Sequence, residues 1–195
     1  MNRREALSTV ALILGGSIVG ANAFLEGCTP ADKKATPEAG GPITFSNDDI
    51  AYLDEIAETI IPATSTPGAK AAKVGTFMTV MVKDCYTDAD QKSFMDGMKQ
   101  INEESKKKFS KSFMEADPKQ RTELLTELDK QTKQSMANAK PGDPKPYFRL
   151  MKELTLLGYF TSEIGATQAL RYVAVPGRYE GCIPYKKGDK AWATA

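Results

Sequence analysis

The stretch SNDDIAYLDEIAETIIP, residues 46–62, carries a complete helix signature. Ser46 is a typical N-cap residue, and the acidic pair Asp48 and Asp49 falls in the first turn, where it complements the helix dipole. Apolar residues then recur at spacings of three and four, which places them on one helix face: Ile50, Leu53, Ile56, Ala57, Ile60 and Ile61. Pro62 lacks a backbone donor and ends the pattern. The stretch therefore predicts an amphipathic helix that needs a partner surface.

Downstream of this stretch the chain predicts a loop and two more helices. The dipeptide Pro67-Gly68 marks a turn. The second helix is expected to end near Cys85, and the third to open at a capping box formed by Thr87 and Asp90. The apolar stripes of these two helices are Val74, Phe77, Met78 and Met81, then Phe94, Met98, Ile101, Phe109 and Phe113.

Two further helices complete the predicted body. The fourth opens at Asp117, an N-cap that is followed by proline at the first helical position, and it ends before the proline-rich connector 141–146. The fifth runs from about Tyr147 to Phe160. The apolar residues of this pair are Leu124, Leu125, Leu128 and Met136, then Phe148, Met151, Leu154 and Leu157.

Strand signals are confined to residues 172–175, and Pro176 cuts them short. We therefore expect an all-α fold, a single domain of about five helices over residues 45–195 with an irregular C-terminal wrap. The apolar stripes are interpreted as core, because methionine and aromatic side chains fill the interior of helix bundles without any cofactor.

The first 27 residues predict an export signal. A basic start containing Arg3 and Arg4 precedes an uncharged run from residue 9 to residue 25, which is shorter than the ~20 residues that span a bilayer as a helix. Weak hydrophobicity after paired arginines suits a twin-arginine signal, the route for proteins that fold before export. The chain is therefore expected in the periplasm.

Cys28 follows the apolar run directly, in the context Leu25-Glu26-Gly27-Cys28, which resembles a bacterial lipobox. In a lipobox the cysteine receives lipid and becomes the new N-terminus, and two or three acyl chains anchor a protein stably. The alternatives are an ordinary signal peptide with an incidental cysteine, or a buried N-terminal helix. Residues 28–44 are rich in proline, glycine, alanine and charge, and predict a flexible tether between the lipid and the folded body.

Composition excludes several function classes. The chain has no histidine, so catalysis and metal or haem binding through imidazole are excluded within it. Its 26 Lys and Arg balance 25 Asp and Glu without a long basic block, which argues against nucleic acid as a partner. Asp84, Asp88 and Asp90 cluster at a turn, but they lack the spacing of a calcium-binding EF-hand loop, and helix capping is the favoured interpretation. No site for a metal or cofactor is expected in this chain.

The remaining cysteines, Cys85 and Cys182, are expected to form an internal disulfide, because export leads to an oxidising compartment. The alternatives are two buried free thiols or a bond to another chain. Aromatic and arginine residues crowd around the second cysteine, and such residues are enriched where proteins meet. The candidate interface residues are Tyr172, Arg178, Tyr179 and Tyr185. The same segment is also interpreted as a wrap around its own domain, and both roles can hold together, with one face packed and the other exposed.

The sequence resembles the gluconate 2-dehydrogenase subunit 3 family, the small subunits of membrane-associated flavin-dependent sugar and polyol dehydrogenases. The resemblance rests on the Arg-Arg signal, the block Leu53 to Gly68 (LDEIAETIIP, then TPGA), the turn Asp84-Cys85-Tyr86, and the segment Gly158 to Tyr185. It implies a non-catalytic accessory subunit. The large partner, similar to glucose-methanol-choline oxidoreductases, would hold FAD and oxidise the substrate, and a cytochrome is a further possible partner.

In this interpretation the small subunit lends its twin-arginine signal to the folded flavoprotein and stabilises it. The lipobox departs from the family's soluble form, and implies that this member also anchors the complex to the membrane. An alternative of a different class is a free-standing helical periplasmic lipoprotein that acts as a binding or envelope scaffold.

Overall fold

The computed structural model describes residues 43–140, 143–175, 177–178 and 181–193. The predicted signal peptide with Arg3 and Arg4, the lipidation site Cys28, almost all of the tether and the interface residue Tyr179 lie outside the described residues.

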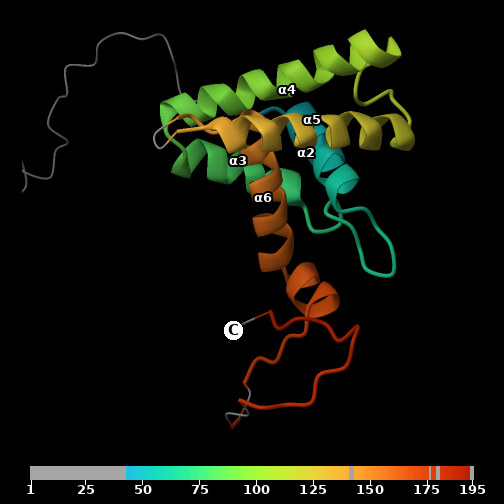
Figure 1. Ribbon diagram of the computed structural model, residues 1–195, viewed down its shortest axis with the longest axis vertical. Helices are drawn as coiled ribbons and strands as arrows, with labels where there is room; N and C mark the ends of the chain where they lie inside the picture. The colour runs from blue at the N-terminus through green and yellow to red at the C-terminus, as the bar shows by residue number, and fades with distance from the viewer. Residues whose placement is uncertain (1–42, 141–142, 176, 179–180, 194–195) are drawn as a thin grey trace, which may run out of the picture. The chain divides into compact units, whose positions relative to one another are not determined.

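Five α-helices and one short π-helix make up the described part of the chain (Figure 1). They are α2 (Asn47–Ile60), α3 (Val74–Cys85), α4 (Asp88–Phe109), α5 (Pro118–Asn138), α6 (Tyr147–Thr161) and η1 (Gly165–Ala169). Among the described residues the only β-type pairing is an isolated bridge between Arg171 and Trp192. The prediction of an all-α domain of about five helices is therefore confirmed.

Three helices, α2, α4 and α5, start where the sequence predicts them, because their N-cap side chains satisfy backbone donors that a helix leaves free. The Asp49 amide donates to Ser46 Oγ at 3.2 Å, and the Ser46 amide donates to Asp49 Oδ2 at 2.8 Å, so α2 opens with a capping box. Asp117 and Gln120 form the same reciprocal pair at the start of α5, and the Thr87 hydroxyl accepts from the Asp90 amide at α4.

Helix α6 is the central element of the domain. It contacts each of the other four α-helices and also η1. Figure 1 shows α6 running across the direction of α4 and α5, with its C-terminal half extending past them toward η1 and the C-terminal residues. Its N-terminal half buries Phe148, Leu150, Met151 and Leu154. The helix thus joins the packed body to the segment that follows it.

Phe113 is fully buried. The sequence predicts that it belongs to the third helix, but it lies in the loop that follows α4. Helix α4 ends at Phe109, and Ser110 adopts a left-handed backbone conformation with a φ of 57° that turns the chain. The Phe113 ring then packs edge-on against Tyr52 with the ring centroids 5.5 Å apart, and its amide donates to Asn102 Oδ1 at 3.1 Å. A loop residue therefore fills a core position.

Two residues of the predicted stripes are exposed instead of buried. Met136 is 39% exposed, because the last core residue of α5 is Thr132 and every following residue of that helix is exposed. Leu157 is 47% exposed on the half of α6 that extends past the other helices. No helix among the described residues is long and apolar enough to cross a membrane.

Candidate partner interface

The carboxylates of α2 hold the loop that follows it. Asp54 Oδ1 accepts from the Gly75 amide at 2.7 Å, and Glu58 accepts from the amides of Ala63 and Lys70 at 2.9 and 2.8 Å. A Cβ on Gly68 would lie 2.2 Å from a Glu58 carboxylate oxygen, so a larger residue there would displace this anchoring carboxylate. The acidic residues of this sequence block therefore have a structural role.

Side chains from other helices complete this anchoring. The Tyr159 hydroxyl on α6 donates to the Pro67 carbonyl at 2.7 Å, across 92 residues of sequence. Glu55 pairs with Lys70 at 3.0 Å and with Arg121, whose guanidinium also donates to the carbonyls of Phe113 and Met114. Burial acts to raise the pKa of Glu55, but Lys70 and Arg121 outweigh it, and the pKa lies below its ordinary value.

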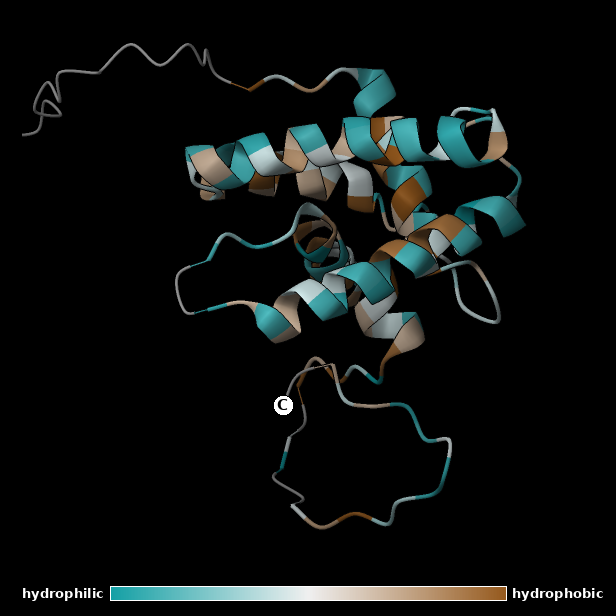
Figure 2. Cartoon of the chain, turned by 45° about the horizontal axis from the view of Figure 1, so that its top comes forward, coloured by the Kyte–Doolittle hydropathy of each residue, from teal (hydrophilic) through white to brown (hydrophobic). Residues whose placement is uncertain are grey.

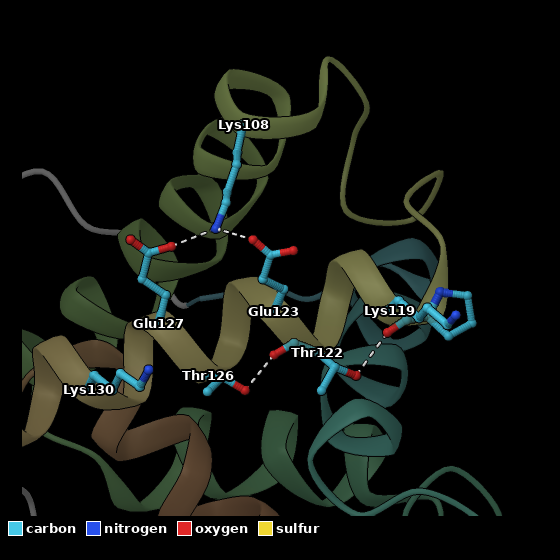
Figure 3. Close-up of a pocket in the computed structure, with 8 residues that line it drawn as sticks. Lys108, Lys119, Thr122, Glu123, Thr126, Glu127 and Lys130 are labelled. Atoms are coloured by element: carbon cyan, nitrogen blue, oxygen red, sulfur yellow. Dashed lines mark hydrogen bonds and ion pairs between the residues drawn. The ribbon is translucent and has the colours of Figure 1, made fainter.

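A surface groove lies between the end of α4 and the first half of α5 (Figure 3). Lys108 bridges Glu123 and Glu127 there, with nitrogen–oxygen distances of 2.8 and 2.7 Å. Thr122 and Thr126 also line the groove, and their hydroxyls donate to carbonyls of their own helix. These ion pairs and hydrogen bonds account for the positions of the side chains in the groove, and no catalytic role is needed to explain them.

The described residues contain no group of three or more Cys, Asp or Glu side chains that could hold a metal ion. Asp88 and Asp90 lie in the first turn of α4, where Asp90 Oδ2 accepts from the Thr87 hydroxyl at 2.9 Å. Asp90 therefore takes part in capping α4, whereas Asp84 lies in the last turn of α3.

Exposed apolar side chains gather on α6 and after it. Leu156, Leu157 and Phe160 are each at least 40% exposed on α6. We call residues 171–192 the C-terminal loop; its exposed apolar residues are Tyr172, Val173, Val175, Ile183, Tyr185 and Trp192. Figure 2 shows hydrophobic stretches recurring along this loop, below the helices. Scattered exposed apolar residues are common in soluble proteins, and a group of them on neighbouring segments is a candidate interaction surface.

Three of the four interface residues predicted from sequence lie in the described part of this loop. Tyr172 is 47% exposed, Tyr185 is 77% exposed and Arg178 is exposed. Their role in binding stays a prediction. The sequence reasoning missed Leu156, Leu157 and Phe160, since an apolar stripe on a helix reads as core wherever its neighbours are unknown.

The C-terminal segment is irregular, as predicted, but it does not wrap the domain. Its described residues between Tyr172 and Trp192 are all exposed, and Figure 1 shows the segment as a loop beyond the end of α6. The segment is therefore exposed at the end of α6.

Cys85 and Cys182 are both free and exposed, so the predicted disulfide is not formed in this structure. Cys85 ends α3 within the helical body, whereas Cys182 belongs to the C-terminal loop, and a bridge would require the loop to move to the body. Pairing in the exported protein stays a prediction, which peptide mapping without reducing agent would test.

Comparison with known families gives one match. The model of gluconate 2-dehydrogenase subunit 3 matches residues 47–177, from the first residue of α2 into the C-terminal loop. No curated protein and no solved structure matches the chain. The matched range covers well over half of the sequence and contains the five α-helices of the described residues, η1 and the loop that the α2 carboxylates anchor. The chain therefore belongs to the gluconate 2-dehydrogenase subunit 3 family.

Proposed function

We propose that this chain is a non-catalytic accessory subunit of a periplasmic, membrane-associated, FAD-dependent dehydrogenase of the sugar or gluconate type. The family match over residues 47–177 is the observation that carries the proposal. The side chains are consistent with it: the sequence has no histidine, and the acidic residues of α2 serve to anchor a loop.

The catalytic work belongs to a partner. A flavoprotein similar to glucose-methanol-choline oxidoreductases holds FAD and oxidises the substrate, and a cytochrome is the further partner that would receive the electrons. In this division of labour the small subunit contributes a stable helical body and an exposed apolar surface. Its task is to bind and stabilise the flavoprotein.

Co-purification tests this proposal directly. The full chain, tagged at its C-terminus, is extracted from membranes of its natural host with a mild detergent and captured. We expect a yellow complex whose absorbance shows flavin and which reduces a dye when sugar or gluconate is added. A chain captured alone would favour the lipoprotein scaffold instead. Dye reduction by the isolated chain would show that it is itself an enzyme.

The proposal includes export and anchoring, which rest on the sequence pattern of the N-terminus. The double variant Arg3→Lys, Arg4→Lys should abolish export of the flavoprotein, because the twin-arginine route reads the arginine pair. The matched control, Lys33→Arg with Lys34→Arg, changes the same residue types in the tether and should leave export intact. Cys28→Ser should release the exported complex from the membrane.

A further inference from the structure

The neck of the C-terminal loop is closed by contacts between its two ends. The Arg171 amide donates to the Ala191 carbonyl at 2.8 Å, and the Ala193 amide donates to the Arg171 carbonyl at 2.9 Å. The Arg171 guanidinium lies 3.9 Å from the centroid of the Trp192 ring, a cation–π contact. We call these contacts between Arg171 and residues 191–193 the clasp.

The clasp is fixed to the helical body through η1. The Lys190 ammonium donates to the Gln168 carbonyl, and the Leu170 amide donates to the Gly165 carbonyl at 2.9 Å. Gly165 is itself buried against the end of α6, with its amide donating to Ser162 Oγ at 3.0 Å. The loop is therefore long and exposed, but both of its ends are held at one place on a rigid support.

A loop of this length without helix or strand is uncommon in a compact domain and is usually functional. Closing its ends before binding removes part of the entropy that would otherwise be lost on association. Outside the neck its described side chains are exposed, among them two large aromatic ones. The clasp thus holds an apolar binding element in a restricted set of conformations.

The chemistry of the loop indicates what it binds. Residues 171–193 contain five Lys or Arg and two Asp or Glu, whereas the whole chain is balanced at 26 to 25. The excess of positive charge accompanies the exposed tyrosines, and Leu156, Leu157 and Phe160 continue the apolar surface along α6. A complementary partner has an apolar cleft with an acidic rim. The loop alone offers about twenty residues, close to the 20–30 that one side of a standard protein interface uses.

We infer that the C-terminal loop and the exposed side of α6 dock into the catalytic flavoprotein subunit, and that the clasp presets the loop for docking. The inference rests on the proposed function, which supplies the partner. The docking residues are Leu157, Phe160, Tyr172, Val175 and Tyr185, and Arg171 and Trp192 are positioning residues.

The docking part is tested on the tagged complex described above, by the flavin absorbance that remains on the resin during a timed wash. Val175→Asp and Tyr185→Ala should each speed the loss of flavin at least about tenfold, since each removes an exposed anchor from the interface. The control is Met136→Asp, which also places a charge at an exposed apolar residue, but at the end of α5, remote from the loop. It should leave the rate of flavin loss unchanged. Lys186→Glu with Lys187→Glu should slow association and weaken its salt dependence.

The clasp is tested separately in the free chain. Trp192 is the only tryptophan, so its fluorescence reports on the clasp alone. Arg171→Ala should make the ring more accessible to acrylamide, while Arg149→Ala on α6 should not. In the complex, Trp192→Ala should speed flavin loss about tenfold, and Trp192→Phe, which keeps an aromatic face for Arg171, should restore most of the stability.

The outcomes of these experiments distinguish the docking surface, the role of the clasp and the proposed function from one another. Retention of flavin by all the loop variants, with the wild-type complex intact, would overturn the docking surface and leave the proposed function standing. Weaker binding by Val175→Asp together with unchanged binding by Trp192→Ala would overturn the role of the clasp. A wild-type chain that captures no flavoprotein would overturn the proposed function and this inference with it.

Discussion

Gly165 shows how a single side-chain atom can be excluded by the backbone. A Cβ at this position would lie 1.8 Å from the Tyr159 carbonyl oxygen, and that oxygen belongs to a helix and cannot rotate away. Glycine is therefore what allows the chain to turn from α6 into η1. The C-terminal loop depends on this turn for its place at the end of α6.

Gly165→Ala should destabilise the protein by about 3 kcal/mol, the upper end for overpacking, since backbone has to shift. Urea unfolding followed by circular dichroism measures this change. Gln168→Ala in the same π-helix, where the side chain is exposed, should change the free energy of unfolding by less than about 0.5 kcal/mol. Equal unfolding midpoints for the two variants would contradict this reading of Gly165.

Glu55 links stability to acid pH. Because its pKa is lowered in the folded chain, folding favours the ionised carboxylate. The stability that it contributes is fully present above the ordinary glutamate pKa, and is lost as pH falls through the lowered value. Asp54 acts in the opposite sense, since burial raises its pKa despite the hydrogen bond from the Gly75 amide. The contribution of Glu55 must therefore be isolated by comparing variants.

Glu55→Gln should lower the free energy of unfolding by about 1.5–3 kcal/mol at pH 7, because the partly buried Arg121 loses a charged partner. The difference from wild type should shrink as pH falls below the ordinary glutamate pKa and through the lowered pKa of Glu55, where the wild-type carboxylate becomes protonated. Urea titrations across this range provide the measurement. Glu123→Gln, which removes an exposed partner of Lys108, should cost less than about 1 kcal/mol. A pH-independent difference for Glu55→Gln would rule out the linkage.

At the scale of elements, α5 depends on the cap at its first turn. Asp117 accepts from the amides of Lys119 and Gln120, both at 3.0 Å, and the Gln120 side chain accepts from the Asp117 amide at 3.1 Å. These contacts satisfy donors that the first helical turn leaves free. Arg121 follows directly, so the position of the cap also places the guanidinium that holds the α4–α5 loop.

Asp117→Ala should therefore destabilise the protein by about 1 kcal/mol, the usual cost of losing an N-cap. Asp117→Asn keeps an acceptor at the cap and should cost only a few tenths of a kcal/mol. Thermal unfolding of the two variants beside wild type makes the comparison. If asparagine proved as costly as alanine, the charge of Asp117 would matter more than its hydrogen bonds.

At the scale of the whole molecule, the helical body and the C-terminal loop contribute unequally to the free energy of unfolding. The buried apolar core ends at Tyr159, and the described residues of the loop between Tyr172 and Trp192 are exposed. Burial of apolar surface is the main favourable term in folding. The body therefore supplies stability, and the loop supplies a surface.

Ending the chain after Arg171 should leave the free energy of unfolding within about 1 kcal/mol of wild type, because hardly any buried apolar surface is lost. Circular dichroism and thermal melting of the truncated chain test this. Ending the chain after Pro146 instead removes Phe148, Met151, Leu154 and Tyr159 from the core, and should abolish cooperative unfolding. A large loss of stability when the chain ends after Arg171 would mean that the loop packs on the body.

The sequence by itself determined the α-helices of the described residues and where three of them begin. Ser46, Thr87 and Asp117 are N-caps as predicted, and each acts on an amide two or three residues away. Helix stripes likewise repeat every three or four residues. Such interactions lie within one or two turns of chain, so the order of residues is enough to specify them.

Only the tertiary structure decided which faces are covered. Phe113 enters the core from a loop, Met136 and Leu157 leave it, and the C-terminal loop is presented at the end of α6. The contacts behind these outcomes join distant parts of the chain, such as the Tyr159 hydroxyl and the Pro67 carbonyl. Whether an apolar side chain becomes core or interface depends on what its neighbours in space cover, and that is a property of the packed helices together.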